Sequence, residues 1–217
     1  VEEVELVAFA DIDESKARAL AERYGVPGVY TDYREMIVTE RPDIVSIATP
    51  CTVHAEVAIF AAEHGVRGIY CEKGLACSLA EADAVRAAVQ RHGTKFNMGT
   101  LRRWHPGMTT ARQMIEAGAI GSLHSVISYT NGALLHSASH YLDTMLFLAG
   151  DPGVQWVQGN VLNSDFDPQA DRCETDLSGM GIIRFSNGVL GYLLTTTLIA
   201  EFEVTGSEVV IRARNNL

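Results

Sequence analysis

The first half of the chain alternates between short apolar runs and segments whose apolar residues recur at helical spacing. The apolar runs, several of which are rich in β-branched residues, predict strands at residues 4–10, 44–48, 69–71 and 95–98. The strands at residues 44–48 and 69–71 are expected to be buried, and the first of these two to be buried on both faces. Helices are expected between the strands, with end signals at Asp13, Gly25, Asp32, Thr52, Gly65, Ser78 and Gly93. Such alternation specifies a doubly wound parallel α/β sheet.

The pattern changes near residue 99, where strands begin to follow one another with few helices between them. Two helices are expected, at residues 106–117 and 139–149. The segment Ser186-Asn187-Gly188 is a strong hairpin signal. This half therefore predicts an α+β domain with a mainly antiparallel sheet, whose strands are expected at residues 123–130, 154–161, 178–185, 189–197, 201–205 and 208–213.

Composition narrows the classes of partner. The chain has 217 residues, a hydrophobic content of 47% and a net charge of -10. This charge argues against nucleic acid and anionic membrane surfaces as partners. No apolar run approaches membrane-spanning length. The four cysteines form no CxxC pair, so we expect reduced structural thiols in a cytoplasmic protein, ahead of disulfides or zinc.

Polar residues follow the expected parallel strands directly. In open sheets of this kind, ligands bind outside the carboxyl ends of the strands, so one rim is expected to carry Thr49, Pro50, His54, Glu72 and Lys73. His54 is expected either in a nicotinamide pocket or as a solvent-facing histidine in the first turn of its helix. These residues are the first place where chemistry is expected.

Asp11 ends the first expected strand. In a dinucleotide-binding unit, an acidic residue at this point accepts hydrogen bonds from the adenosine ribose. The alternative is a helix N-cap, a role that Asp13 suits better. No GxGxxG motif occurs in the sequence. We therefore expect residues 1–98 to form a Rossmann-type dinucleotide-binding domain whose first strand and phosphate loop precede Val1, and residues 99–217 to form a substrate-binding and oligomerisation domain.

Three polar residues share one face of the helix expected at residues 139–149 and the turn before it. His136, His140 and Asp143 are spaced by four and three residues. A histidine suits proton transfer because its ordinary pKa is near neutrality, but this spacing could also hold zinc, and a lone histidine can simply belong to the core. His105, beside Pro106, is expected to be structural.

Taken together, these segments resemble the glucose–fructose oxidoreductase, inositol dehydrogenase and MocA (Gfo/Idh/MocA) family. The resemblance rests on ADID at Asp11, SIATPCTVH ending at His54, YCEKG around Lys73, MGTLRRWHP ending at Pro106, AGAIG ending at Gly121 and HSASHYLD ending at Asp143. It implies a two-domain enzyme that uses NAD or NADP to oxidise or reduce sugars, inositols and related polyols. The family's active site lies between the Rossmann domain and an open-faced sheet domain, whose sheet often forms the oligomer interface.

The resemblance also implies roles for single residues. Lys73 matches a lysine that reaches the substrate hydroxyl and the nicotinamide ribose, and His140 matches the proposed acid/base. The other matches are Asp11 with the ribose acceptor, Thr49 and Pro50 with the turn passing the nicotinamide, and Arg102, Arg103 and Asp143 with groups beside the substrate. Gly74 stands where the family has proline, and His136 stands where many members carry an aspartate that assists catalysis.

The resulting expectation is an NAD(P)-dependent oxidoreductase that transfers hydride between the cofactor and a sugar, inositol or related polyol. NAD is expected in preference to NADP, because Asp11 would repel a 2′-phosphate. Apolar residues on both faces of residues 178–197 predict a homodimer or homotetramer. The alternatives are a non-catalytic dinucleotide-sensing protein and, behind it, a metal-dependent enzyme using His136, His140 and Asp143.

Overall fold

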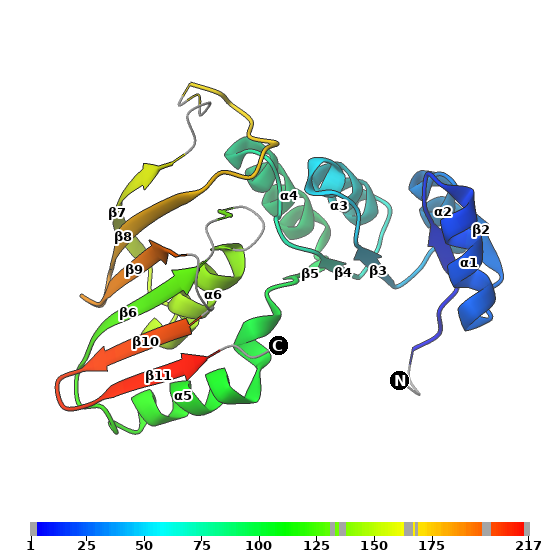
Figure 1. The fold of residues 1–217 in the computed structure, drawn as a ribbon. Coiled ribbons are helices and arrows are strands. Elements are labelled where there is room, and N and C mark those ends of the chain that lie inside the picture. The colour runs from blue at the N-terminus through cyan, green and yellow to red at the C-terminus, as the bar shows by residue number, and fades with distance from the viewer. Residues whose placement is uncertain are drawn as a thin grey trace. The chain divides into compact units, whose positions relative to one another are not determined.

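The structure, a computed structural model, describes residues 4–130, 133–134, 138–162, 167, 169–196 and 201–214. It divides into two compact units, Val1–Gly99 and Thr100–Leu217, whose helices and strands are labelled in Figure 1. The domain boundary expected from the sequence fell one residue earlier. None of the helices in the described ranges is long and apolar enough to cross a membrane.

The first unit is built from short parallel strands and helices. Its elements are β1 (Ala8–Ala10), α1 (Glu14–Tyr24), β2 (Gly28–Tyr30), α2 (Tyr33–Glu40), β3 (Ile44–Ile47), the 3-10 turn η1 (Cys51–Val53), α3 (His54–Glu63), β4 (Gly68–Cys71), α4 (Leu79–His92) and β5 (Lys95–Met98). β1 pairs with β2, and β4 lies between β3 and β5, all in parallel. If β1 to β5 are counted as the second to sixth strands, these pairings agree with the Rossmann order 3-2-1-4-5-6.

Most helix ends lie where the sequence predicts them. The Asp13 side chain accepts from the Ser15 N–H at 3.1 Å before α1, and Gly25 ends this helix in the left-handed region with φ 67°. Ser78 caps α4 by accepting from the Glu81 N–H at 3.1 Å. The cap expected at Thr52 is wrong, because the chain first forms η1 and α3 then begins without a side-chain cap.

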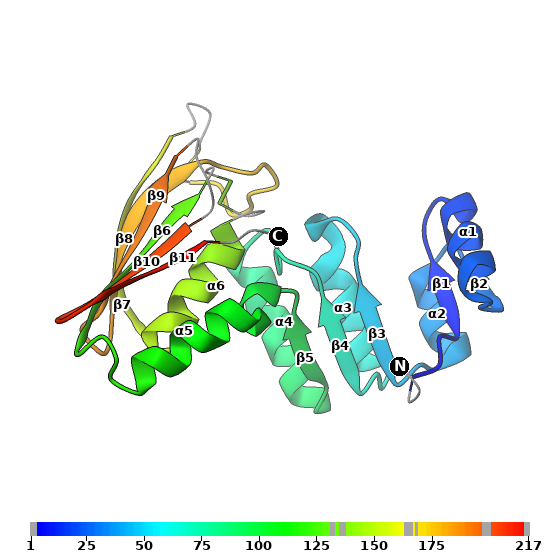
Figure 2. The same cartoon turned by 60° about the horizontal axis from the view of Figure 1, so that its bottom comes forward.

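Two strand predictions need correction. The strand expected at residues 4–10 is only Ala8–Ala10, because its described partner β2 has three residues; β2 itself was not predicted. The strand predicted at residues 44–48 is buried on one face rather than both. Val45 and Ile47 pack into a core with α3 and α4, which contact each other and lie on one side of the sheet (Figure 2). Ile44, on the other face of the strand, is exposed.

The second unit contains one six-stranded sheet and two longer helices. Its elements are the 3-10 turn η2 (Leu101–Trp104), α5 (Pro106–Glu116), β6 (Leu123–Thr130), α6 (Ala138–Ala149), β7 (Val154–Val161), β8 (Gly179–Phe185), β9 (Leu190–Thr195), β10 (Glu201–Gly206) and β11 (Val210–Arg214). The strand order is β11-β10-β6-β9-β8-β7, and only β6 and β9 are parallel. The mainly antiparallel prediction is confirmed, and so is the hairpin, since the Gly188 N–H donates to the Phe185 carbonyl at 3.0 Å.

The core of this unit lies between the sheet and α6. Met145 and Leu148 are fully buried with Phe185 and Phe202. A side chain at Gly191 would collide with Met145, so this glycine lets the helix approach β9 closely. The packing fixes α6, which carries His140, on the sheet.

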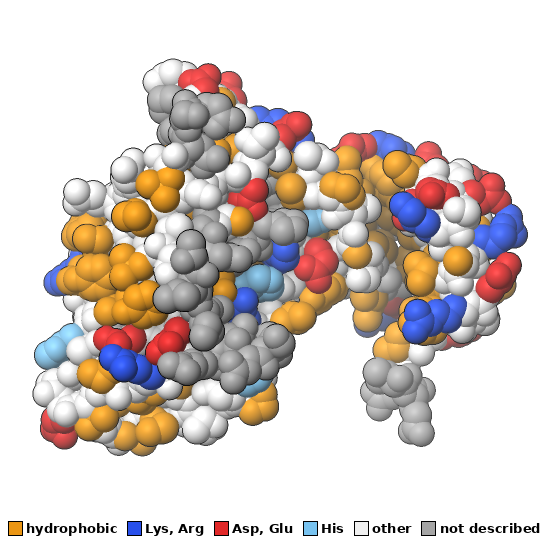
Figure 3. Space-filling model, viewed as in Figure 1, with side chains coloured by type: hydrophobic (Ala, Val, Ile, Leu, Met, Phe, Trp, Pro, Cys, Tyr) orange, Lys and Arg blue, Asp and Glu red, His pale blue; other side chains and the backbone are white. Residues whose placement is uncertain are grey.

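The opposite face of the sheet is rich in apolar side chains. Cross-strand partners Ile127, Tyr192 and Ile182 follow one another across β6, β9 and β8. Glu203 on β10 forms an ion pair with Arg212 of β11 at 2.9 Å beside them. Figure 3 shows the hydrophobic side chains gathered over these strands, with acidic and basic side chains next to them.

Candidate functional site

The carboxyl ends of the three-stranded sheet meet at one edge of the first unit. In register, Ile47 of β3 lies beside Cys71 of β4, which in turn lies beside Met98 of β5. The chain stays paired just beyond the strands, because the Glu72 N–H donates to the Ile47 carbonyl at 2.8 Å. The segments that carry Thr49 and Lys73 therefore leave the sheet side by side.

His54 joins the segments that follow β3 and β4. Its Nε2 lies 2.7 Å from the Thr49 carbonyl oxygen, and its Nδ1 lies 2.7 Å from the Gly74 carbonyl oxygen. Since carbonyl oxygens only accept, both contacts are hydrogen bonds together only when both ring nitrogens carry hydrogen. The ring is 1% exposed, so the expectation of a solvent-facing His54 is wrong. Any part it plays in a cofactor pocket stays a prediction.

Lys73 and Glu72 lie at the end of β4. Lys73 is half-buried and, in the part of the chain that the structure describes, its ammonium group forms no ion pair. The Glu72 carboxylate accepts from the Lys73 backbone N–H at 3.3 Å and lies near the Tyr70 hydroxyl. Burial, followed by the charge of Glu72, raises the pKa of the Tyr70 phenol. The Lys73–Gly74 peptide bond is cis.

Asp11 directly follows β1. Its Oδ1 accepts from the Asp13 N–H at 2.9 Å, which orients the carboxylate at the strand end. Among the described residues no other group donates to this carboxylate, so Oδ2 can accept from a hydroxyl group. An acceptor at the end of this strand fits the ribose of a dinucleotide, which offers hydroxyl donors.

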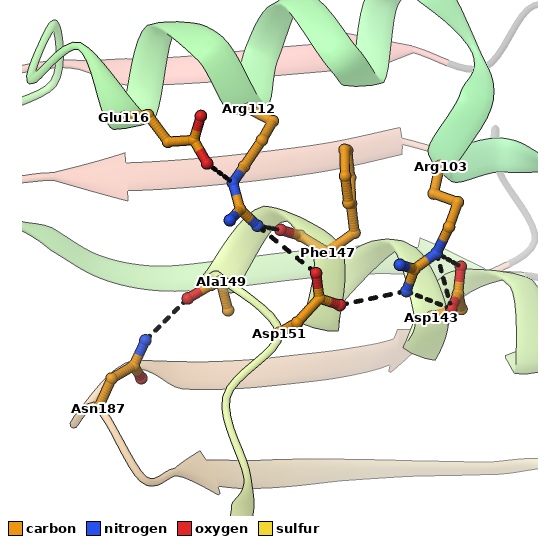
Figure 4. Close-up of polar contacts among 8 residues, drawn as sticks. All are labelled: Arg103, Arg112, Glu116, Asp143, Phe147, Ala149, Asp151 and Asn187. Carbon is orange, nitrogen blue, oxygen red and sulfur yellow. Dashed lines mark hydrogen bonds and ion pairs between the residues drawn. The ribbon is translucent and has the colours of Figure 1, made fainter.

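Arg103 and Asp143, both expected beside the substrate, contact each other in the second unit. Arg103 Nε lies 2.9 Å from Asp143 Oδ2 and Nη2 lies 2.6 Å from Oδ1, so the pair is bidentate (Figure 4). The two side chains are 25% and 17% exposed. The hydrogen bond with Asp143 raises the pKa of the Arg103 guanidinium. Their ion pair ties η2 to α6.

Asp151 extends this contact into a network that sequence reasoning missed. Its Oδ1 lies 3.2 Å from Arg103 Nη2, and its Oδ2 lies 3.8 Å from Arg112 Nη1. Arg112 also donates to the Phe147 carbonyl near the end of α6. The only sequence signal was the helix stop formed by Gly150 and Pro152, between which Asp151 adopts a positive φ of 51°.

The remaining predicted residues lie on or beside α6. Arg102 stacks on Tyr141, with its guanidinium carbon 4.1 Å from the ring centroid. His140 is half-buried in the first turn, and its carbonyl accepts from the Thr144 hydroxyl at 2.8 Å. His136 lies outside the described residues. Within those that are described, no group of three or more His, Cys, Asp or Glu side chains could hold a metal ion.

The chain is similar to dehydrogenases of sugars and related compounds. It is 34% identical over 122 residues to D-apiose dehydrogenase of Paraburkholderia graminis, covering 56% of this chain and 32% of that protein. It is 26% identical to D-glucoside 3-dehydrogenase of Escherichia coli, covering 89% and 63%. A solved structure of levoglucosan dehydrogenase with NADH and levoglucosan has a TM-score of 0.83 and 27% identity, covering 96% of this chain and 64% of that one.

Two family models cover most of the sequence. Residues 1–100 match the oxidoreductase family with an NAD-binding Rossmann fold, and residues 127–212 match the Gfo/Idh/MocA C-terminal domain. The chain spans less than two thirds of the length of the two curated relatives named above. The two matches lie in the expected order and correspond to the two units. The chain belongs to the Gfo/Idh/MocA oxidoreductase family.

Proposed function

We propose that this protein is an NAD-dependent oxidoreductase that acts on the CH–OH group of a sugar, inositol or related polyol. The observation that carries the proposal is the strand-end edge of the first unit, where His54 holds the Thr49 turn against the segment after Lys73. The similarity to apiose, glucoside and levoglucosan dehydrogenases supports the substrate class.

The proposed cofactor sites use residues of the first unit. Asp11 accepts from the adenosine ribose through its available carboxylate oxygen, which favours NAD over NADP because a 2′-phosphate would meet a negative charge. Thr49 and Pro50 form the turn beside the nicotinamide. Glu72, the first residue after β4, follows the neighbouring strand at the same edge of the sheet. When bound, the cofactor supplies the hydride acceptor or donor.

Two side chains are proposed for proton transfer. Lys73 is a half-buried ammonium group without an ion-pair partner among the described residues, and such a group is available to hold or release a proton at a substrate hydroxyl. His140 is the second acid/base candidate, and His136 is proposed to orient it. Because Arg103 and Asp143 bind each other, we propose that they hold α6 in place. Of the two neighbouring arginines, Arg102, which stacks on Tyr141, is then the one proposed to contact the substrate.

The open face of the six-stranded sheet is the proposed interface of a homodimer or homotetramer. Its apolar centre, formed by Ile127, Ile182 and Tyr192, is bordered by Glu203 and Arg212, as expected of an interface with an apolar core and a polar rim. Light scattering at micromolar concentration tests this, and a monomer would contradict it. We place the assembled enzyme in the cytoplasm.

The function is tested with protein expressed from its complete reading frame. NADH and NADPH are titrated by fluorescence, and turnover is then measured with NAD⁺ and a panel of aldoses, glycosides and inositols. The proposal expects tighter binding of NADH and turnover with part of the panel. Tight NADH binding without turnover on any compound would favour a dinucleotide-sensing protein, the alternative raised by Gly74 in place of the family's proline.

A further inference from the structure

Two cysteines from different segments meet at the strand-end edge of the first unit. Cys51 begins η1 just after β3, and Cys77 lies immediately before Ser78, the N-cap of α4. Their Sγ atoms are 3.9 Å apart, although 26 positions separate them in sequence. Both are thiols in the structure. The contact was not predicted, because the sequence contains no CxxC spacing.

The backbone on both sides of this contact is held in place. The ring nitrogens of the buried His54 each lie 2.7 Å from a carbonyl oxygen, that of Thr49 and that of Gly74, which are two and three residues from the two cysteines. The Cys77 N–H donates to Glu81 Oε2 at 2.9 Å, which ties it to the first turn of α4. Because independent contacts fix both segments, the two sulfur atoms are kept near each other rather than meeting by chance motion of loops.

We propose that Cys51 and Cys77 are a dithiol site that a hydroperoxide oxidises reversibly to an intramolecular disulfide. The two sulfur atoms are 3.9 Å apart, and a disulfide bond is about 2.05 Å long. The movement that closes this gap is smaller than the displacement of a sulfur atom when one cysteine side chain changes rotamer. The resulting bond would link the turn after β3 covalently to the segment after β4.

The oxidation proceeds in two balanced steps. The Cys51 sulfur attacks one peroxide oxygen and breaks the O–O bond, which yields a sulfenic acid and one water or alcohol. The Cys77 sulfur then attacks the Cys51 sulfur, the S–O bond breaks, and the released hydroxide leaves as water with the proton of the Cys77 thiol. Two thiols are oxidised to one disulfide, and the peroxide is reduced.

Exposure decides which sulfur reacts first. Cys77 is only 5% exposed, whereas Cys51 is partly exposed and can be reached by a small oxidant. The nearby Cys71 is a matched control, because burial raises the pKa of its thiol to about 12 and so keeps it out of the reactive thiolate form. Cys173, in the second unit, is a partly exposed control outside the pair.

The disulfide is detected by peptide mapping of oxidised protein. Protein expressed from its complete reading frame is treated with a small excess of hydrogen peroxide, alkylated with N-ethylmaleimide, digested with trypsin and analysed by mass spectrometry. Trypsin places Cys51, Cys71 and Cys77 on different peptides, which span residues 35–67, 68–73 and 74–86. The expected product joins the first and third of these peptides, in protein that remains monomeric in size on a non-reducing denaturing gel, and dithiothreitol reverses it.

Variants separate this outcome from general oxidation. Cys51→Ser and Cys77→Ser should each abolish the linked peptide, whereas Cys71→Ser and Cys173→Ser should leave its yield unchanged. Linkage through Cys71, linkage only between two chains, or oxidation of Cys51 to its sulfinic acid while Cys77 stays alkylated would each overturn the proposal. The readout is covalent and independent of turnover, so it can fail while the proposed dehydrogenase activity holds.

Discussion

Cutting the Arg103–Asp143 ion pair tests the energetic role of the network that holds α6. We expect the two single changes to differ. Asp143→Ala leaves Arg103 with Asp151, whose Oδ1 lies 3.2 Å from Nη2. Arg103→Ala leaves Asp143, 17% exposed, with no basic partner among the described residues and also removes the contact of the guanidinium with Phe147. Arg103→Ala should therefore be the more destabilising change.

The magnitude follows from burial and geometry. Exposed ion pairs contribute about 0.2–1 kcal/mol, and breaking a fully buried pair costs about 3–5 kcal/mol. The Arg103–Asp143 pair is mostly buried and bidentate, and it lies between these limits. We expect about 2–3 kcal/mol for Asp143→Ala, about 3–4 kcal/mol for Arg103→Ala, and a coupling energy of about 1.5–2.5 kcal/mol in the double-mutant cycle.

Urea unfolding followed by tryptophan fluorescence measures these energies in the second unit, which contains the ion pair. The chain has two tryptophans, Trp104 and Trp156, and both belong to the second unit. The matched control is the Arg172–Glu174 pair of the same unit, whose Nε–Oε1 distance is 2.7 Å and whose side chains are 37% and 59% exposed. Its coupling should be at most about 0.5 kcal/mol. Equal coupling energies for the two pairs would refute the claim that burial makes the Arg103 network important.

Three further predictions concern single side chains. With a thiol pKa raised to about 12, Cys71 has a thiolate fraction near pH 8 about a thousandfold below that of an ordinary thiol, so iodoacetamide should alkylate it far more slowly than Cys173. Burial and then a hydrogen bond raise the pKa of Tyr33 to about 12, above the pKa of about 10 in the unfolded chain. The stability that this shift contributes is complete below pH 10 and is lost as the pH rises from about 10 through 12. In thermal melts over that window, Tyr33→Phe should therefore lose less stability than the unchanged protein. Lys73→Met and His140→Ala should each lower kcat by about a hundred- to ten-thousandfold while NADH affinity changes little.

Matched variants make the last comparison specific. Lys95→Met removes an exposed lysine from β5, the strand that pairs with the strand before Lys73. His124→Ala removes an exposed histidine from β6, in the same unit as His140. Both should retain full turnover. Full activity in His140→Ala would remove α6 from the mechanism, and equal losses in the control variants would point to a general effect on folding.

The features that the sequence predicted well are local ones. Asp13 and Ser78 begin helices, and Gly25 and Gly93 end them, through contacts within a few residues, so their positions follow from the local sequence. The hairpin at Gly188 is of the same kind. The three-residue strand β2 was missed because so short a run carries no periodicity.

The contacts that were missed join distant positions. His54 lies 20 residues from Gly74, and Arg103 lies 40 residues from Asp143. The sequence placed each residue on the expected strand end or helix but could not show that its polar atoms bind one another, because these partners meet only through the tertiary fold. The resemblance that brought Arg103 and Asp143 forward as substrate contacts therefore gave no sign of their ion pair.

Transfer of a labelled hydrogen tests the proposed activity most directly. Protein expressed from its complete reading frame is incubated with a polyol that is oxidised in the turnover panel, carrying deuterium on its CH–OH carbon, and with NAD⁺. We predict that deuterium appears at C4 of the nicotinamide in one stereoisomer only, and that Lys73→Met makes the same product at a rate lower by about a hundredfold or more. Reduced cofactor without deuterium, or no reduced cofactor with any sugar or polyol despite tight NADH binding, would contradict the assignment of this chain as a dehydrogenase.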